Sequence, residues 1–298
     1  AVWAAIDPGV SEGLDDGFAD FLWPDRSTVA GRGGDDFVAP DIRTEFVPAS
    51  AIDAPDVDWD VAWGPPPVLY ADDLAEAFDP VGLSDALRPL AEGCGRWIQA
   101  SRDALAADAG LSTKELSAAE DGITACEAIA ARLDDGVNLL LTDDDARLAF
   151  CFANRAIALQ AGWARPERGR FRWRPFQLAF LLLNIAPLAN PIVPERRTLD
   201  LLWFPTGGGK TESYLALTAF VLALRRRRAL TSGDPARGTG TAVISRYTLR
   251  LLTVQQFRRA LGLITACEVL RIQDLDLSGR PVGWRPSGSP RTDFLWGT

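Results

Sequence analysis

Histidine and methionine are both absent from the 298 residues of this chain. Without histidine there is no imidazole to act as a general base beside a serine or cysteine, and no imidazole ligand for a metal. The four cysteines, Cys94, Cys126, Cys151 and Cys267, are scattered and form no Cys-x-x-Cys pair. The sequence therefore argues against a zinc site, a disulfide framework and a histidine-dependent hydrolase, and it is typical of a reducing cytoplasm.

Long apolar runs are lacking as well. The longest, at 176–193, contains a glutamine, two asparagines and two prolines, so its apolar core is much shorter than the ~20 residues that a bilayer requires. Residues 1–30 are acidic and interrupted by glycine and proline, unlike a signal peptide. We therefore expect a cytoplasmic protein with no membrane association.

Charge is distributed unevenly along the chain. Residues 1–160 carry 10 lysines and arginines against 31 aspartates and glutamates, whereas residues 161–298 carry 21 against 9. An acidic half followed by a basic half predicts two structural units, with any polyanionic partner bound by the second.

Local patterns divide the chain further. Residues 1–69 are rich in glycine, proline and aspartate, which predicts an irregular acidic region. Residues 70–162 repeat apolar side chains three and four positions apart, which predicts a helical domain. Ser112 or Thr113 could cap one helix, and Asp143 to Asp145 could begin another; capping is favoured over a metal site formed by the three aspartates.

Residues 163–298 combine helical and strand-like patterns. The apolar run at 198–204 ends before a proline and predicts a buried parallel strand, and 241–246 predicts a second strand. Helices are predicted at about 175–186, over 210–228 after the first strand, and over 249–272 after the second. Alternating strands and helices indicate an α/β fold with a parallel sheet in this part of the chain.

The stretch between the first strand and its helix has the composition of a phosphate-binding loop. Gly209, Lys210 and Thr211 match the end of the G-x-x-x-x-G-K-[ST] pattern, although Phe204 stands where the first glycine is usual. Glycines at 207–209 let backbone amides approach an anion, and the start of a helix adds partial positive charge. Lys210 would contact the outer phosphates of ATP, and the Thr211 hydroxyl would bind Mg²⁺.

Lysine is scarce, which makes its position informative. Only Lys114 and Lys210 occur among 31 basic residues. A compact ammonium fits a phosphate loop where a planar guanidinium does not, so a lysine at 210 supports the phosphate-loop interpretation.

Three segments together resemble a known family. "RPFQ" (174–177), "FPTGGGKT" (204–211) and "AVISRYTLRLLTVQQ" (242–256) resemble, in order, the R-P-x-Q, P-T-G-x-G-K-T and P-T-R-x-L-x-x-Q motifs of superfamily-two helicases. The resemblance implies an incomplete RecA-like domain over 163–298 and catalytic roles for Lys210 and Thr211, with Gln177 reading adenine and Thr211 as the metal ligand. The implied cofactor-binding set is Arg174, Gln177, Pro205, Thr206, Gly207, Gly208, Gly209, Lys210, Thr211 and Glu212. The implied nucleic-acid contacts are Arg246, Thr248, Arg250, Gln255 and Gln256.

Over residues 60–298 the amino-acid sequence resembles one group of such proteins more closely still. "RPFQLAFLLLN", "LWFPTGGGKTESYLALTAF" and "RYTLRLLTVQQFRRA" resemble the DrmA-type helicases of the DISARM anti-phage system. This resemblance implies a bacterial defence ATPase that acts on DNA, single-stranded or at a duplex end, together with a partner protein.

The chain also departs from the helicase pattern. No D-E-x-[HD] acidic box follows Lys210, and no second domain with arginine fingers is present. We therefore expect this chain to be part of a longer motor and to be inactive alone. Two alternatives remain, a small-molecule phosphate-loop kinase and a non-catalytic scaffold that docks a protein partner.

Two further basic clusters have more than one interpretation. Arg225 to Arg228 end a predicted helix, where a solvated helix end is favoured over a DNA contact. The segment 163–173 alternates aromatic residues with arginines and could stack on bases, but packing of its aromatic side chains on the rest of the protein is at least as well supported.

Overall fold

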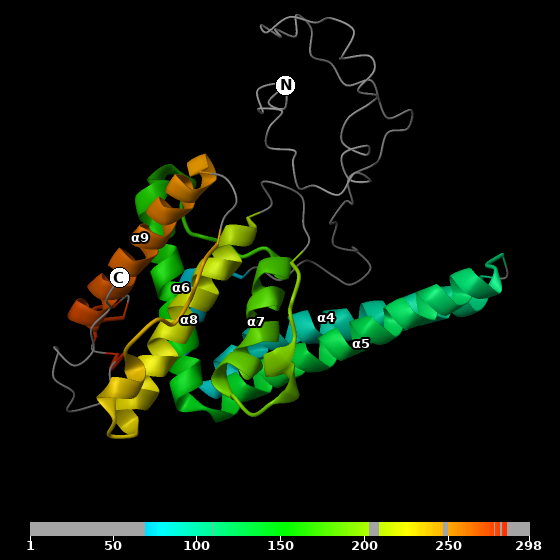
Figure 1. Ribbon diagram of the computed structural model, residues 1–298, viewed down its shortest axis with the longest axis horizontal. Coiled ribbons are helices and arrows are strands. Elements are labelled where there is room, and N and C mark those ends of the chain that lie inside the picture. The colour runs from blue at the N-terminus through cyan, green and yellow to red at the C-terminus, as the bar shows by residue number, and fades with distance from the viewer. Residues whose placement is uncertain are drawn as a thin grey trace, which may run out of the picture. The chain divides into compact units, whose positions relative to one another are not determined.

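The computed structural model describes residues 69–108, 110–202, 209–246, 250–276, 278–280 and 282–284. Contacts divide the chain after Val57, and all of the described residues fall in the second unit, Asp58–Thr298. The predicted irregular region 1–69 lies outside the described residues except for Leu69. The α-helices are α3 (Ala71–Ala75), α4 (Pro80–Ala107), α5 (Thr113–Thr142), α6 (Asp144–Ala164), α7 (Pro175–Ala189), α8 (Lys210–Thr231) and α9 (Arg250–Gln273) (Figure 1).

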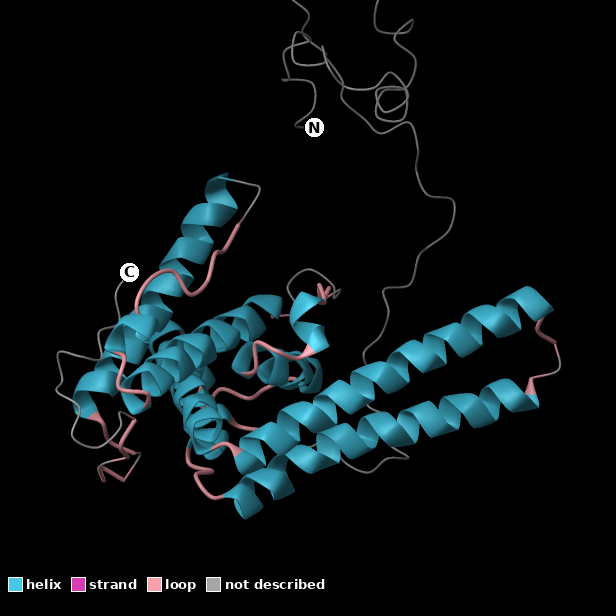
Figure 2. Ribbon diagram, turned by 60° about the horizontal axis from the view of Figure 1, so that its bottom comes forward, coloured by secondary structure: helices cyan, strands magenta, loops and turns pink. Residues whose placement is uncertain are grey.

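Capping residues explain where the long helices begin. Asp79 caps α4 by accepting a hydrogen bond from the Gly82 amide, and Pro80 occupies the first helical position, where its missing N–H costs nothing. Ser112 and Glu115 form a reciprocal capping box at the start of α5, which confirms the predicted cap at that point. The antiparallel pair α4 and α5 lies side by side in both views (Figure 2).

A single residue separates α5 from α6. Asp143 ends α5 and caps α6, where its carboxylate accepts a hydrogen bond of 2.9 Å from the Ala146 amide. The predicted role of this aspartate as a helix cap is confirmed. The chain therefore turns sharply at Asp143, and α6 lies at the centre of the described residues.

Helix α6 forms the middle of one continuous hydrophobic core. It contacts α3, α5, α8 and α9, while α7 packs between α5 and α8. Phe150, Phe152 and Ile157 of α6 are buried in a core that extends from Leu69 to Trp284. Residues on both sides of position 163 contribute to this core, and the predicted domain boundary there stays a prediction.

The predicted α/β fold with a RecA-like parallel sheet is wrong for the described residues, which contain helices but no strands (Figure 2). The predicted helices near 175–186, 210–228 and 249–272 are confirmed as α7, α8 and α9. Segments 198–202 and 241–246, which we predicted as buried strands, are without regular structure. Leu199, Leu201 and Ile244 are 95%, 85% and 86% exposed.

The reason for this error is that an apolar run specifies a side-chain pattern and not a hydrogen-bonding partner. A strand needs a neighbouring strand to satisfy its amides and carbonyls, and among the described residues the two segments have none. Helix α8, which we expected to pack on a sheet, instead buries Ala216, Ala219 and Phe220 against α6 and α7. Of the helices in the described residues, none combines the length and apolar character that a membrane span needs.

Gly136 permits the closest approach between two of these helices. A Cβ atom at Gly136 of α5 would lie 2.1 Å from the carbonyl oxygen of Leu182 in α7. Gly122, in the same helix, would meet nothing within 4 Å. We expect Gly136→Ala to lower the free energy of unfolding by about 1–3 kcal/mol because the helices must separate.

The matched substitution Gly122→Ala should instead raise that free energy by roughly 0.5–1 kcal/mol, since alanine is the better helix former. Urea unfolding followed by circular dichroism measures both changes. Equal stability of the two variants would contradict the close packing of α5 on α7.

Candidate functional site

Helix α8 begins directly after a glycine with left-handed backbone geometry. Gly209 has φ 91° and ψ 26° and precedes Lys210, the first residue of the helix. Gly209 is the N-cap residue and has no side chain with which to cap the helix. The first-turn amides and the partial positive charge of the helix end are the features that proteins use to bind phosphate groups.

Gln177 holds this glycine in place from α7. Its Nε2 donates a hydrogen bond of 2.7 Å to the Gly209 carbonyl oxygen, and its Oε1 accepts one of 2.9 Å from the Arg174 amide. The Gln177 side chain is 4% exposed. The structure therefore brings together the two segments "RPFQ" and "GKT", which are 32 residues apart at this contact.

The same contact explains why residue 209 is glycine. A Cβ atom there would lie 2.5 Å from Gln177 Nε2, and the positive φ is unfavourable for other residues. Ser213, one turn into α8 and fully buried, adds a hydrogen bond of 3.3 Å from its Oγ to the Gln177 carbonyl oxygen. The starts of α7 and α8 are thus fixed to each other.

This arrangement changes what Gln177 can do. Both polar groups of its amide already bond to the backbone, so its observed role is to hold the turn before α8. Its role in reading adenine stays a prediction.

The remaining cofactor-binding residues divide into two groups. Lys210 and Thr211 are half-buried in the first turn of α8, next to Gly209. Pro205, Thr206, Gly207 and Gly208 lie outside the described residues, so their part in a phosphate cradle stays a prediction. Among the described residues no group of three or more potential ligands could hold a metal ion, and Thr211 as a Mg²⁺ ligand also stays a prediction.

Glu212 contacts a residue that the sequence analysis missed. Its Oε1 pairs with Arg259 of α9 at 2.5 Å. The backbone of α9 is fixed at the same residue, because Gln160 Nε2 of α6 donates to the Arg259 carbonyl oxygen. No motif marks Arg259, and its 47-residue separation from Glu212 leaves no local signal that could have found the pair.

The predicted nucleic-acid residues cluster around the start of α9. Arg246 is exposed at the end of segment 241–246, and Gln255 is exposed on α9. Gln256 is half-buried, and its Oε1 has no hydrogen-bond partner among the described residues. Arg250 is the first residue of α9, while Thr248 lies outside the described residues. Contact of these residues with DNA stays a prediction.

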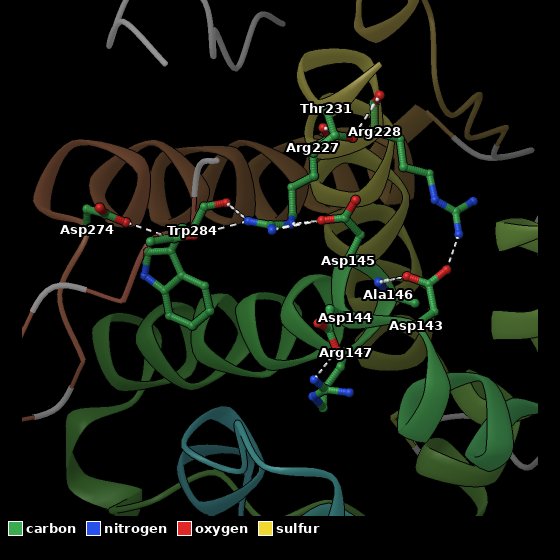
Figure 3. A network of polar contacts seen from close by, with 11 residues as sticks. Asp143, Asp144, Asp145, Ala146, Arg147, Arg227, Arg228, Thr231, Asp274 and Trp284 are labelled. Atoms are coloured by element: carbon green, nitrogen blue, oxygen red, sulfur yellow. Dashed lines mark hydrogen bonds and ion pairs between the residues drawn. The ribbon is translucent and has the colours of Figure 1, made fainter. Parts of the chain in front are cut away.

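The arginines at the end of α8 have structural roles. Arg227 is buried, with its Nε 2.9 Å from Asp145 Oδ1 and its Nη1 2.7 Å from the Trp284 carbonyl oxygen (Figure 3). Arg228 pairs with Asp143, and Arg225 donates to the carbonyl oxygens of Thr239 and Thr241. For Arg227 both earlier interpretations, a solvated helix end and a DNA contact, are wrong.

The three aspartates opposite these arginines are also accounted for. Asp143 and Asp145 pair with the end of α8, and Asp144 pairs with Arg147 one turn along α6 (Figure 3). The metal alternative for Asp143–Asp145 finds no support among the described residues.

The aromatic segment before α7 packs on the protein. Trp173 is buried and donates from Nε1 to Asn154 Oδ1 at 2.7 Å, and Phe171 meets it edge to face. Arg170 pairs with Asp73 and lies over the Tyr70 ring. Packing of this segment is therefore confirmed for Phe171 and Trp173, while Trp163 is exposed.

Comparison with known proteins adds independent evidence on the family. No protein-family model matches the chain. The chain is, however, 37% identical over 252 residues to the DISARM protein DrmA of Bacillus paralicheniformis. The chain is DrmA-like. The similarity covers 78% of this chain and 22% of that relative, so this DrmA-like chain corresponds to about a fifth of the relative's length. The resemblance to DrmA-type proteins seen in the sequence is confirmed.

Arg227 of this DrmA-like chain offers a direct test of the network in Figure 3. Arg227→Ala leaves Asp145 and two backbone carbonyl oxygens without their buried partner. We expect the free energy of unfolding to fall by about 3–5 kcal/mol, the usual cost of breaking one side of a buried ion pair.

Arg225→Ala provides the control in the same helical turn. It loses only hydrogen bonds to the Thr239 and Thr241 carbonyl oxygens at a more exposed position, and should cost about 1 kcal/mol. Chemical denaturation compares the two variants. A similar small loss for both would show that the Arg227 pair contributes little to stability.

Proposed function

We propose that this DrmA-like chain is part of an ATP-dependent DNA helicase or translocase that acts in DISARM anti-phage defence. The observation that carries the proposal is the contact between Gln177 and Gly209, which places the R-P-x-Q segment against the start of the helix that begins with Lys210 and Thr211. In a helicase these two segments belong to one nucleotide site. The similarity to the DISARM protein DrmA supports the defence role.

In this proposal the start of α8 binds the phosphates of ATP. First-turn amides and the helix dipole favour the negative charge, and the Lys210 ammonium adds a mobile cation. Thr211 would hold Mg²⁺, which neutralises charge as the terminal phosphate leaves. The left-handed turn at Gly209, held by Gln177, supports this proposal because it would position these groups before nucleotide arrives.

DNA would lie along segment 241–246 and the first turns of α9. Arg246 is exposed there, and Gln255 projects from the same region. The excess of basic residues in 161–298 supports a polyanionic partner. A protein partner from the same defence system is part of the proposal, because the relative's name places it within DISARM.

The first test replaces Lys210 in the full-length protein that contains this chain. Lys210→Ala removes the mobile cation, so we expect ATP binding and DNA-stimulated ATP hydrolysis to fall by about 10²-fold or more. Lys114 is the only other lysine in the chain and is exposed at the start of α5, which makes Lys114→Ala the matched control. Its activity should stay within about twofold of the wild type, as for most surface substitutions.

The outcomes of this test separate the candidate functions. Undiminished hydrolysis in Lys210→Ala would refute the site. Hydrolysis that depends on Lys210 but ignores DNA would point to a small-molecule kinase instead. Absence of nucleotide binding by the wild-type protein would favour the docking scaffold.

The second test measures how salt changes DNA affinity. Each phosphate neutralised by a basic residue contributes roughly 0.9 to the slope of log affinity against log salt. We expect Arg246→Ala to reduce this slope by about 1 and to weaken binding similarly for all sequences. Arg237→Ala, another exposed arginine, is the control and should leave the slope unchanged. An unchanged slope for Arg246→Ala would remove segment 241–246 from the DNA path.

A further inference from the structure

The ion pair between Glu212 and Arg259 joins the two regions that the proposed function assigns to nucleotide and to DNA. Glu212 lies in the first turn of α8, two residues after Lys210. Arg259 lies on α9, the helix that also carries Gln255 and Gln256. The two side chains are 25% and 37% exposed, so water only partly screens their charges.

The carboxylate of Glu212 lies beside the candidate phosphate position. Its Oε2 is buried without a hydrogen-bond partner among the described residues. The same atom lies 3.3 Å from the point that a Cβ atom of Gly209 would occupy. A phosphate bound at the start of α8 would therefore meet a second negative charge, and Arg259 is the group that neutralises it.

Arg259 is also well placed to affect the surface of α9. Gln255 and Gln256 precede it by four and three residues, so all three side chains lie on neighbouring positions of one helical face. Gln160 of α6 holds the α9 backbone at Arg259. Rotation or displacement of α9 about this fixed point would move Gln255 and Gln256 relative to α8.

We propose that the Glu212–Arg259 ion pair couples nucleotide binding at the start of α8 to DNA binding at the start of α9. The inference rests on the proposed function and adds a positioning pair to it. A guanidinium binds phosphate and carboxylate with similar geometry, so a bound phosphate competes with Glu212 for Arg259 and also repels Glu212. The altered pairing shifts α9, and by linkage DNA changes nucleotide affinity by the same factor.

The experiment measures DNA affinity with and without a non-hydrolysable ATP analogue. The ratio of the two dissociation constants gives the coupling. In the wild-type protein we expect a ratio that differs from one by at least about fivefold, the lower end of ordinary allosteric couplings. In Arg259→Gln, which keeps a hydrogen-bond donor but loses the charge, the ratio should return to within about twofold of one.

Three further variants make the result specific. Glu212→Gln removes the same charge pair from the other side and should give the same flattened ratio. Arg259→Lys restores the charge and should recover part of the coupling. Arg258→Gln changes an exposed neighbour on α9 and should keep the wild-type ratio. Thermal unfolding of each variant identifies any loss of coupling that comes from loss of the fold.

The outcomes distinguish this inference from the proposed function. A wild-type protein that binds no nucleotide or no DNA would refute the proposed function and the coupling with it. A wild-type ratio of one, or an unchanged ratio in folded Arg259→Gln or Glu212→Gln, would refute the coupling alone. A ratio near one in both Arg259→Gln and Glu212→Gln, with the wild-type ratio kept in Arg258→Gln, would establish the ion pair as the link between the two binding sites.

Discussion

The contact on which the candidate site depends is the pair of hydrogen bonds made by the Gln177 side chain. In the first, Gln177 Oε1 accepts from the Arg174 amide at the start of α7. In the second, Gln177 Nε2 donates to the Gly209 carbonyl oxygen just before α8. A buried amide that lost these partners would be costly, so the contact holds Gly209 in its left-handed conformation. A further bond, from Ser213 Oγ to the Gln177 carbonyl oxygen, also holds the start of α8 next to the "RPFQ" segment.

Helix α6 connects this site to the rest of the described residues. Its first turn binds the end of α8 through Asp143 and Asp145, and near its end Gln160 binds the backbone of α9. The two contacts of Asp143 and Asp145 join charges of opposite sign from the two halves of the chain. The acidic and basic halves therefore pair in part with each other, and the net charge of residues 161–298 overstates the positive charge that remains for DNA.

Sequence patterns predicted the helices well because their signals are local. Apolar spacing located α8 and α9, and the caps at Ser112 and Asp143 follow from hydrogen bonds within one turn. The predicted sheet failed because an apolar run such as 198–204 does not specify a partner strand. The proximity of Gln177 to Gly209 followed only from family resemblance, and Arg259 was missed because its contact with Glu212 depends on how α8 and α9 pack.

In the proposed function, the same packing bears differently on nucleotide binding and on hydrolysis. Hydrolysis requires a group that orients or deprotonates the attacking water, commonly a carboxylate. Glu212 is the carboxylate that follows Lys210 in the first turn of α8, but its charge is already paired with Arg259. Its Oε1 accepts a hydrogen bond from Arg259, and its Oε2 is buried. In the proposed function these residues would hold phosphate and transmit its presence to α9, and Glu212 would act through Arg259 and not on the water.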